Sequence, residues 1–174
     1  MKLMLRSAIA TLAVAVALVV PSAASAAPAS TTFRLVGYEY AFTQTVGSFA
    51  GTGLGNAGDI GAWNATVQHD QLGSTPTYVD GGLFELATAS PNGSADWVTG
   101  TLTHHGGTIT TLNRGAGCTN QQYLVTGTLE DVATSTTSGG TGSMSVVLTH
   151  YRLSLFGRCV IYKARVAGTV SFVY

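Results

Sequence analysis

The chain has 174 residues, with eight basic and eight acidic side chains and a charged fraction of 9%, far below the ~25% of an average protein. Removal of Lys2 and Arg6 with an export signal leaves six basic against eight acidic residues. This balance, without any basic run interleaved with aromatic residues, argues against binding to nucleic acid. Hydrophobic residues make up 45% of the chain, which is enough to bury a core rather than remain disordered.

The first 26 residues are typical of an export signal. Lys2 and Arg6 precede an apolar run over residues 8–20, and Ala24-Ser25-Ala26 fits the small-residue rule for signal peptidase. The run is short for a transmembrane helix and no other long apolar run follows, so we expect no helical membrane anchor. The sequence predicts a signal peptide over residues 1–26, in the alanine-rich bacterial style, and one secreted extracellular domain over residues 27–174.

Period-two alternation of apolar and polar side chains runs through the mature chain and predicts strands rather than helices. In the last segment, Val166 and Val170 share one face, while Lys163 and Arg165 share the other. Clusters of Gly, Asn, Pro and Ser separate the alternating runs. We expect strands over Phe33–Phe42, Gly47–Leu54, Ala62–His69, Tyr78–Thr88, Trp97–His104, Thr108–Leu112, Gln122–Val132, Gly142–Arg152 and Val160–Phe172.

This number of strands predicts an all-β fold, a single antiparallel up-and-down β-barrel of about eight to nine strands, with a two-sheet β-sandwich as the alternative. A recurring apolar–Gly–apolar pattern supports closure, because a glycine on the inner face lets a strand coil sharply. It occurs in Val98–Leu102, Val125–Leu129 and Val166–Val170. The alternation that continues to the aromatic Tyr174 also keeps an eight-stranded outer-membrane barrel open as a minor alternative.

The two cysteines, Cys118 and Cys159, both lie in the exported part, where an even pair predicts one disulfide bond. A zinc site would need more ligands at closer spacing. In an up-and-down order, one strand lies between the two cysteines, so both are expected at the same end of the barrel. The predicted disulfide and the predicted strand order therefore agree.

Three of the four histidines, His69, His104 and His150, each stand two residues after an apolar residue. Alternation sends these three inward and sends His105 to the opposite face from His104. Three imidazoles from three strands could hold a catalytic zinc ion with one open position. No spacing motif supports this set, so we predict neither a metal site nor a cofactor.

The predicted barrel can enclose one small ligand. We expect Trp63 and Tyr162 on the inner face, and with His104 and His150 they form the candidate ligand-binding residues. We predict a non-catalytic binder of a small apolar ligand or of a partner surface, since no nucleophile motif or phosphate loop is present. The alternatives are an enzyme in the same cavity, either a lyase or cyclase or a metal-assisted hydrolase, and a structural protein with a filled core.

Overall fold

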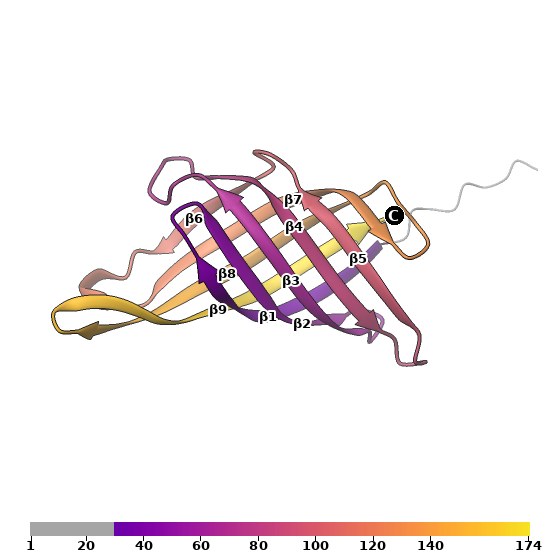
Figure 1. The fold of residues 1–174 in the computed structure, drawn as a ribbon, viewed down its shortest axis with the longest axis horizontal. Helices are drawn as coiled ribbons and strands as arrows, with labels where there is room; N and C mark the ends of the chain where they lie inside the picture. Colours follow the sequence, from indigo (N-terminus) through magenta and orange to yellow (C-terminus); the bar gives the residue numbers. More distant parts are fainter. Residues whose placement is uncertain (1–29) are drawn as a thin grey trace, which may run out of the picture.

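A computed structural model describes residues 30–174, which form a closed antiparallel barrel (Figure 1). The predicted signal peptide lies outside the described residues. Apart from one short 3-10 helix, η1 (Ala116–Cys118), the ordered elements are strands, and no helix of the described part is long and apolar enough to cross a membrane. The strands are β1 (Ser30–Phe42), β2 (Val46–Gly55), β3 (Ile60–His69), β4 (Tyr78–Ala89), β5 (Ala95–Leu102), β6 (Gly107–Asn113), β7 (Gln121–Thr134), β8 (Gly140–Leu155) and β9 (Arg158–Val173).

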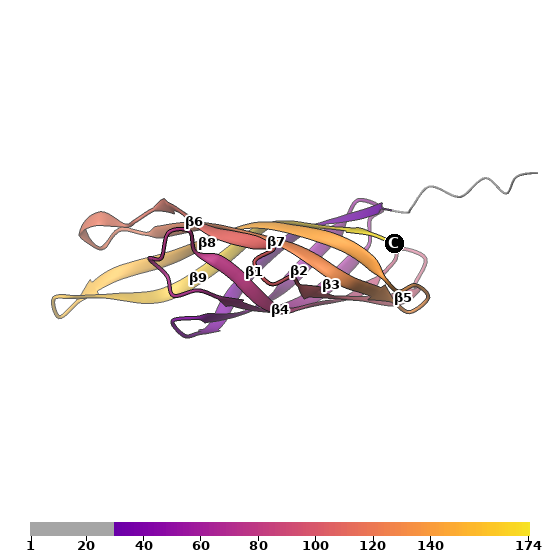
Figure 2. The ribbon, with the colours of Figure 1, turned by 90° about the horizontal axis from the view of Figure 1, so that it is seen from above.

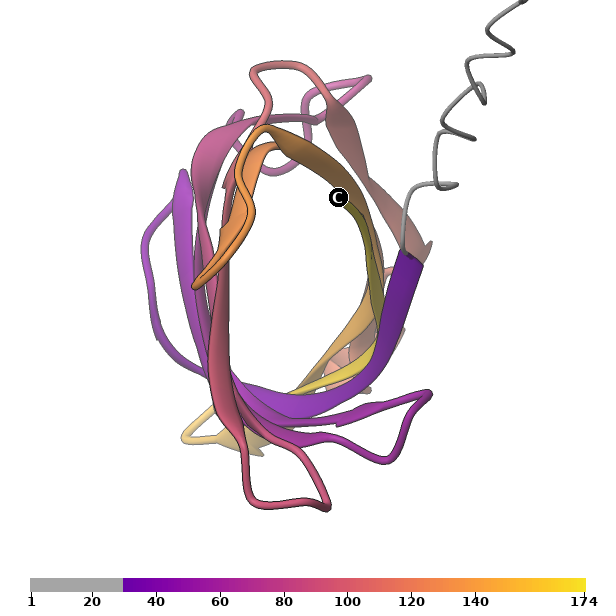
Figure 3. The ribbon, with the colours of Figure 1, turned by 90° about the vertical axis from the view of Figure 1, so that its right-hand side faces the viewer.

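Eight strands close the barrel in an up-and-down order, as predicted. Each of β1 to β4 pairs with the next strand, β5 pairs with β7, β7 with β8, β8 with β9, and β9 returns to β1. Viewed end-on, the strands form one continuous ring (Figure 3). The two-sheet sandwich is therefore wrong.

The extra strand, β6, continues the line of β5. Both strands pair with β4 on one side and with β7 on the other, and both run in the same direction. Residues 103–106 separate them. The segments predicted as separate strands are thus one interrupted wall strand, and this interruption positions the histidines described below.

The two ends of the barrel differ in their connections. At one end, here called the mouth, lie the connections 43–45, 70–77 and 114–120 and the β8–β9 hairpin, which projects beyond the other strands (Figures 1 and 2). At the mouth a disulfide joins Cys118 of η1 to Cys159 of β9, with 5.5 Å between their Cα atoms, which confirms the predicted pairing. Closing a loop of this length stabilises the fold by about 3–4 kcal/mol on the chain-entropy model. Disulfides form in oxidising compartments.

Apolar side chains fill the middle of the barrel. The ring of Phe84 lies between Trp63 and Phe172, with centroid distances of 6.1 Å and 5.8 Å. The void that remains in the centre is only about 10 Å³, barely the space for one water molecule. The interior of this part of the barrel is therefore a packed core.

The outward faces of the strands differ in polarity: that of β1 carries the exposed side chains of Val36, Tyr38 and Tyr40, whereas that of β8 is polar. Along β8, Met144 and Val146 are buried, whereas Thr141, Ser143 and Ser145 are exposed. An outer-membrane barrel carries an apolar outward band around a polar lumen, whereas this barrel has an apolar interior and an exterior with both apolar and polar side chains.

Candidate functional site

The mouth contains the best candidate site, a small interior cavity beneath a wider, open hollow. The cavity has a volume of about 40 Å³ and the hollow about 450 Å³. Both are lined by Phe42, Thr43, Leu72, Tyr123 and His150. The cavity has space for a few water molecules at most, whereas the hollow falls within the usual 300–1,000 Å³ range of small-molecule sites.

A carboxylate and an imidazole meet at the wall of the inner cavity. Nε2 of His150 lies 2.7 Å from Oε2 of Glu39, and the side chains are only 6% and 4% exposed. Because an ionised carboxylate can only accept hydrogen bonds, the imidazole N–H is the donor. Within residues 30–174, Nδ1 of His150 has no hydrogen-bond partner.

Strand alternation explains why these two polar groups point into an apolar interior. Glu39 follows Phe33 and Leu35 on the inward face of β1, and His150 follows Leu148 on the inward face of β8. A β-bulge follows Glu39 in β1, where its pairing with β2 shifts by one residue. Bulges often bend a strand next to a functional site.

Two further polar residues complete the cavity wall. Burial raises the pKa of Tyr123; the positive charge of Arg152 opposes this shift and the negative charge of Glu39 adds to it. The phenol of Tyr123 is therefore a neutral hydrogen-bond donor at ordinary pH. His69 lines the same cavity, with Nδ1 positioned 2.6 Å from the carbonyl oxygen of Asp70.

Trp63, a predicted ligand-binding residue, faces inward but is part of the packed core. Its Nε1–H donates to the carbonyl oxygen of Thr52 at 3.1 Å, and its ring lies against Gly37 and Gly51. A Cβ atom at Gly37 would lie 2.6 Å from Cζ2 of Trp63, so the small residue is required for this packing. Trp63 contributes to the wall of the central void rather than to the hollow.

Tyr162 is on neither the cavity nor the hollow, and the expectation that it faces inward is wrong. Tyr162 is 61% exposed and lies in the projecting part of the β8–β9 hairpin. Tyr162 is also skipped in the pairing of the two strands, between Lys163 and Ile161. Beyond the rim, the inward side of a strand has no barrel interior to face.

His104 also lies outside the barrel, so the structure does not bring the candidate set of His69, His104 and His150 together. β5 ends at Leu102, and the turn that follows breaks the alternation. His69 and His150 share the mouth cavity, whereas the side chain of His104 is 71% exposed. His104 and His105 do not diverge as expected, because their rings stack with centroids 3.9 Å apart.

Sequence reasoning missed Glu39 and Tyr123. The signal for Glu39 was present, because it stands two residues after Gly37 in the same alternating series as Phe33 and Leu35. Tyr123 similarly stands two residues before Val125 on the inward face of β7. A carboxylate on an apolar strand face is a strong indication of a buried polar site.

Comparisons with protein-family models, with curated proteins and with solved structures give no match to this chain.

Proposed function

We propose that this protein acts outside the cytoplasm as a non-catalytic binder of a small ligand, which sits in the mouth of the barrel. The observation that carries the proposal is the buried Glu39–His150 pair at the inner end of the mouth. An apolar pair of similar volume would often be at least as stable there. The presence of two ionisable groups at the floor of an open hollow therefore favours a role in recognition.

The chemistry of the walls defines the class of ligand. Phe42, Leu72 and Ile161 supply apolar surface around the hollow, which suits an aromatic or alicyclic body. Tyr123 and His150 supply hydrogen-bonding groups deeper inside. The expected ligand is thus a small, largely apolar compound with one hydroxyl or carbonyl group directed toward His150. The alternative of a protein partner surface has no comparable polar anchor.

A titration with β-naphthol, compared with naphthalene, tests this proposal. We expect β-naphthol to bind more tightly, because only it can engage the polar groups. Replacement of the mouth residue, Phe42→Ala, should weaken its binding about tenfold, because loss of a phenyl contact removes about 1.4 kcal/mol. Calorimetry of the mature protein measures both effects.

The matched control is Tyr38→Ala, which removes another exposed aromatic side chain of β1, on the outer face. It should leave the affinity for β-naphthol unchanged. Equal losses in the two variants, or no preference for β-naphthol over naphthalene, would contradict the proposal.

The Glu39–His150 pair also supports a second candidate, acid–base catalysis. A histidine oriented by a buried carboxylate is a common general base, and the ring of Tyr123 lies 5.6 Å from that of His150 between centroids. If the site moves protons, the protein should accelerate exchange of the α-protons of β-tetralone in D₂O, and His150→Gln should abolish the acceleration. Exchange at the buffer rate would exclude this candidate.

A further inference from the structure

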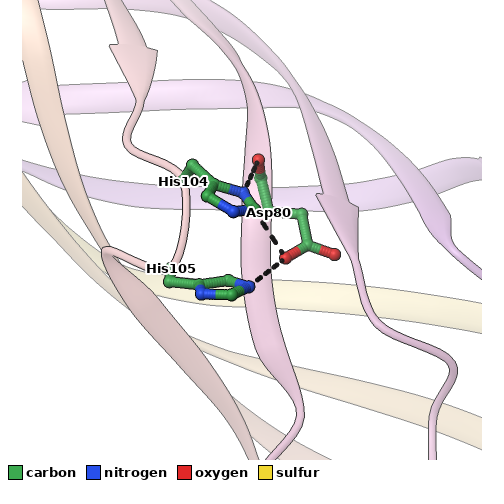
Figure 4. Close-up of side chains that lie close together, drawn as sticks. All are labelled: Asp80, His104 and His105. Carbon is green, nitrogen blue, oxygen red and sulfur yellow. Dashed lines mark hydrogen bonds and ion pairs between the residues drawn. The ribbon is translucent and has the colours of Figure 1, made fainter.

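We infer that Asp80, His104 and His105, on the outer wall of the barrel, form a binding site for a divalent transition-metal ion such as Zn²⁺. The three side chains converge from β4 and from the turn between β5 and β6 (Figure 4). Their ligand atoms all lie within 4.8 Å of one another, in the one such group within residues 30–174. The cluster is separate from the mouth, whose lining includes none of these residues.

The distances suit a shared ion. Oδ1 of Asp80 lies 3.2 Å from Nε2 of His105 and 3.8 Å from Nδ1 of His104. Ligand atoms around a tetrahedral zinc, bound at 2.0–2.1 Å, are about 3.3 Å apart. Small side-chain rotations would therefore complete the coordination. Nδ1 of His104 also lies 3.2 Å from the carbonyl oxygen of Asp80, and a bound ion would replace the proton of that hydrogen bond.

A second observation supports a cation site here. Oδ1 of Asp80 is buried but has no hydrogen-bond partner, although two imidazole nitrogens are close to it. Both nitrogens are near enough for electrostatic attraction, but that of His104 is too distant for a hydrogen bond and that of His105 is not aligned for one. An unsatisfied buried carboxylate oxygen is costly, and an ion held between the three residues would satisfy it.

Two irregularities in neighbouring strands build the cluster. Two successive residues of β3, Gln68 and His69, pair with Gly81 and Val79 of β4. Asp80 lies between these two partners and is the extra residue of a β-bulge in β4. Such a residue leaves the regular alternation and its side chain is redirected. The bulge thereby places the Asp80 carboxylate beside the neighbouring wall strand.

Opposite this bulge, residues 103–106 form a tight turn within the interrupted β5–β6 strand. The N–H of Gly106 donates to the carbonyl oxygen of Thr103 at 2.9 Å, and the N–H of Thr103 donates to Thr128 of β7 at 3.0 Å. His105 has a φ of 55°, a left-handed conformation that is unfavourable for most residues. Its N–H donates to Val79 at 2.9 Å, so hydrogen bonds to both neighbouring strands hold the turn and its two imidazoles in place.

The donor set selects the class of ion. Two imidazoles and one carboxylate are typical ligands of Zn²⁺, Ni²⁺ and Cu²⁺, whereas Ca²⁺ and Mg²⁺ prefer oxygen ligands. The side chains of His104 and His105 are 71% and 53% exposed. The remaining coordination positions therefore face solvent and would be occupied by water or by a ligand from another molecule.

Isothermal titration of the untagged mature protein with Zn²⁺ tests the site. We expect one ion per chain. Asp80→Asn and His105→Asn should each weaken binding by about tenfold or more, since even loss of an outer-shell partner commonly has an effect of that size. Asparagine at position 105 removes the imidazole but tolerates the left-handed backbone, so the turn itself is preserved.

Asp131→Asn is the matched control, because Asp131 is an exposed aspartate outside the cluster that also has a positive φ, of 52°. It should bind Zn²⁺ as the unchanged protein does. No binding at millimolar Zn²⁺, or equal affinity in the Asp80 variant and the Asp131 control, would overturn the inference. Circular dichroism of each variant verifies that the barrel is folded.

Discussion

The barrel brings carboxylate and imidazole groups together in two places, with opposite exposure. At the mouth, the Glu39 and His150 side chains are 4% and 6% exposed and meet at 2.7 Å. On the outer wall, the side chains of His104 and His105 are 71% and 53% exposed, and that of Asp80 is 29% exposed. The same chemical groups therefore have different consequences: breaking the buried pair is costly to stability, whereas ion pairs of the exposed histidines contribute little to it.

The largest expected difference concerns stability. Glu39→Gln leaves the buried His150 without its charged partner, and breaking a buried pair commonly costs about 3–5 kcal/mol. We expect the free energy of unfolding, measured with urea, to fall by about 3 kcal/mol. On the outer wall, Asp80→Asn should change it by no more than about 0.5 kcal/mol.

The double variant Glu39→Gln/His150→Leu sharpens this test. Because it removes both members of the pair, it should recover part of the stability that Glu39→Gln loses. If Glu39→Gln and Asp80→Asn lower the free energy of unfolding by similar amounts, burial does not make the mouth pair more important for stability than the outer cluster.

A substitution in the outer cluster should raise the free energy of unfolding rather than lower it. His105 has a left-handed backbone conformation, which glycine adopts without strain, although glycine also increases the entropy of the unfolded chain. We expect His105→Gly to raise the free energy of unfolding by about 0.5 kcal/mol in metal-free buffer. A loss of stability instead would mean that stacking of His105 on Tyr78 and His104 outweighs the backbone strain.

The smallest effect is a pH dependence at the mouth. Because burial raises the pKa of Tyr123, its stabilising contribution is complete below the ordinary tyrosine pKa of about 10 and is lost as the pH rises through the folded-state value. Absorbance titration should show that one of the seven tyrosines ionises later than an exposed tyrosine. That transition should be absent in Tyr123→Phe, and its persistence would contradict the assignment.

The period-two alternation of the sequence predicted side-chain directions better at the mouth than on the outer wall. His69 and His150 face inward as expected because their strands are regular up to those residues. His104 does not, because β5 ends at Leu102 and a tight turn follows. Such a departure depends on hydrogen bonds to β4 and β7, which no local pattern specifies.

Glycine pairs are the sequence features that accompany both irregularities of the outer wall. Gly81 and Gly82 follow Asp80 and have φ values of 153° and 138°, while Gly106 and Gly107 follow the histidines. Glycine inside a strand often marks a bulge. The pairs indicate that a break is present, but only the pairing of the strands determines that the two breaks face one another.

The four histidines report directly on whether the mouth binds a small ligand. In a ¹H–¹³C spectrum of the imidazole rings, β-naphthol should shift the signal of His150 and leave those of His104 and His105 unchanged. Zn²⁺, added separately, should shift the signals of His104 and His105 and leave that of His150 unchanged. If β-naphthol shifts no histidine, or shifts the outer pair rather than His150, the mouth is not the ligand site.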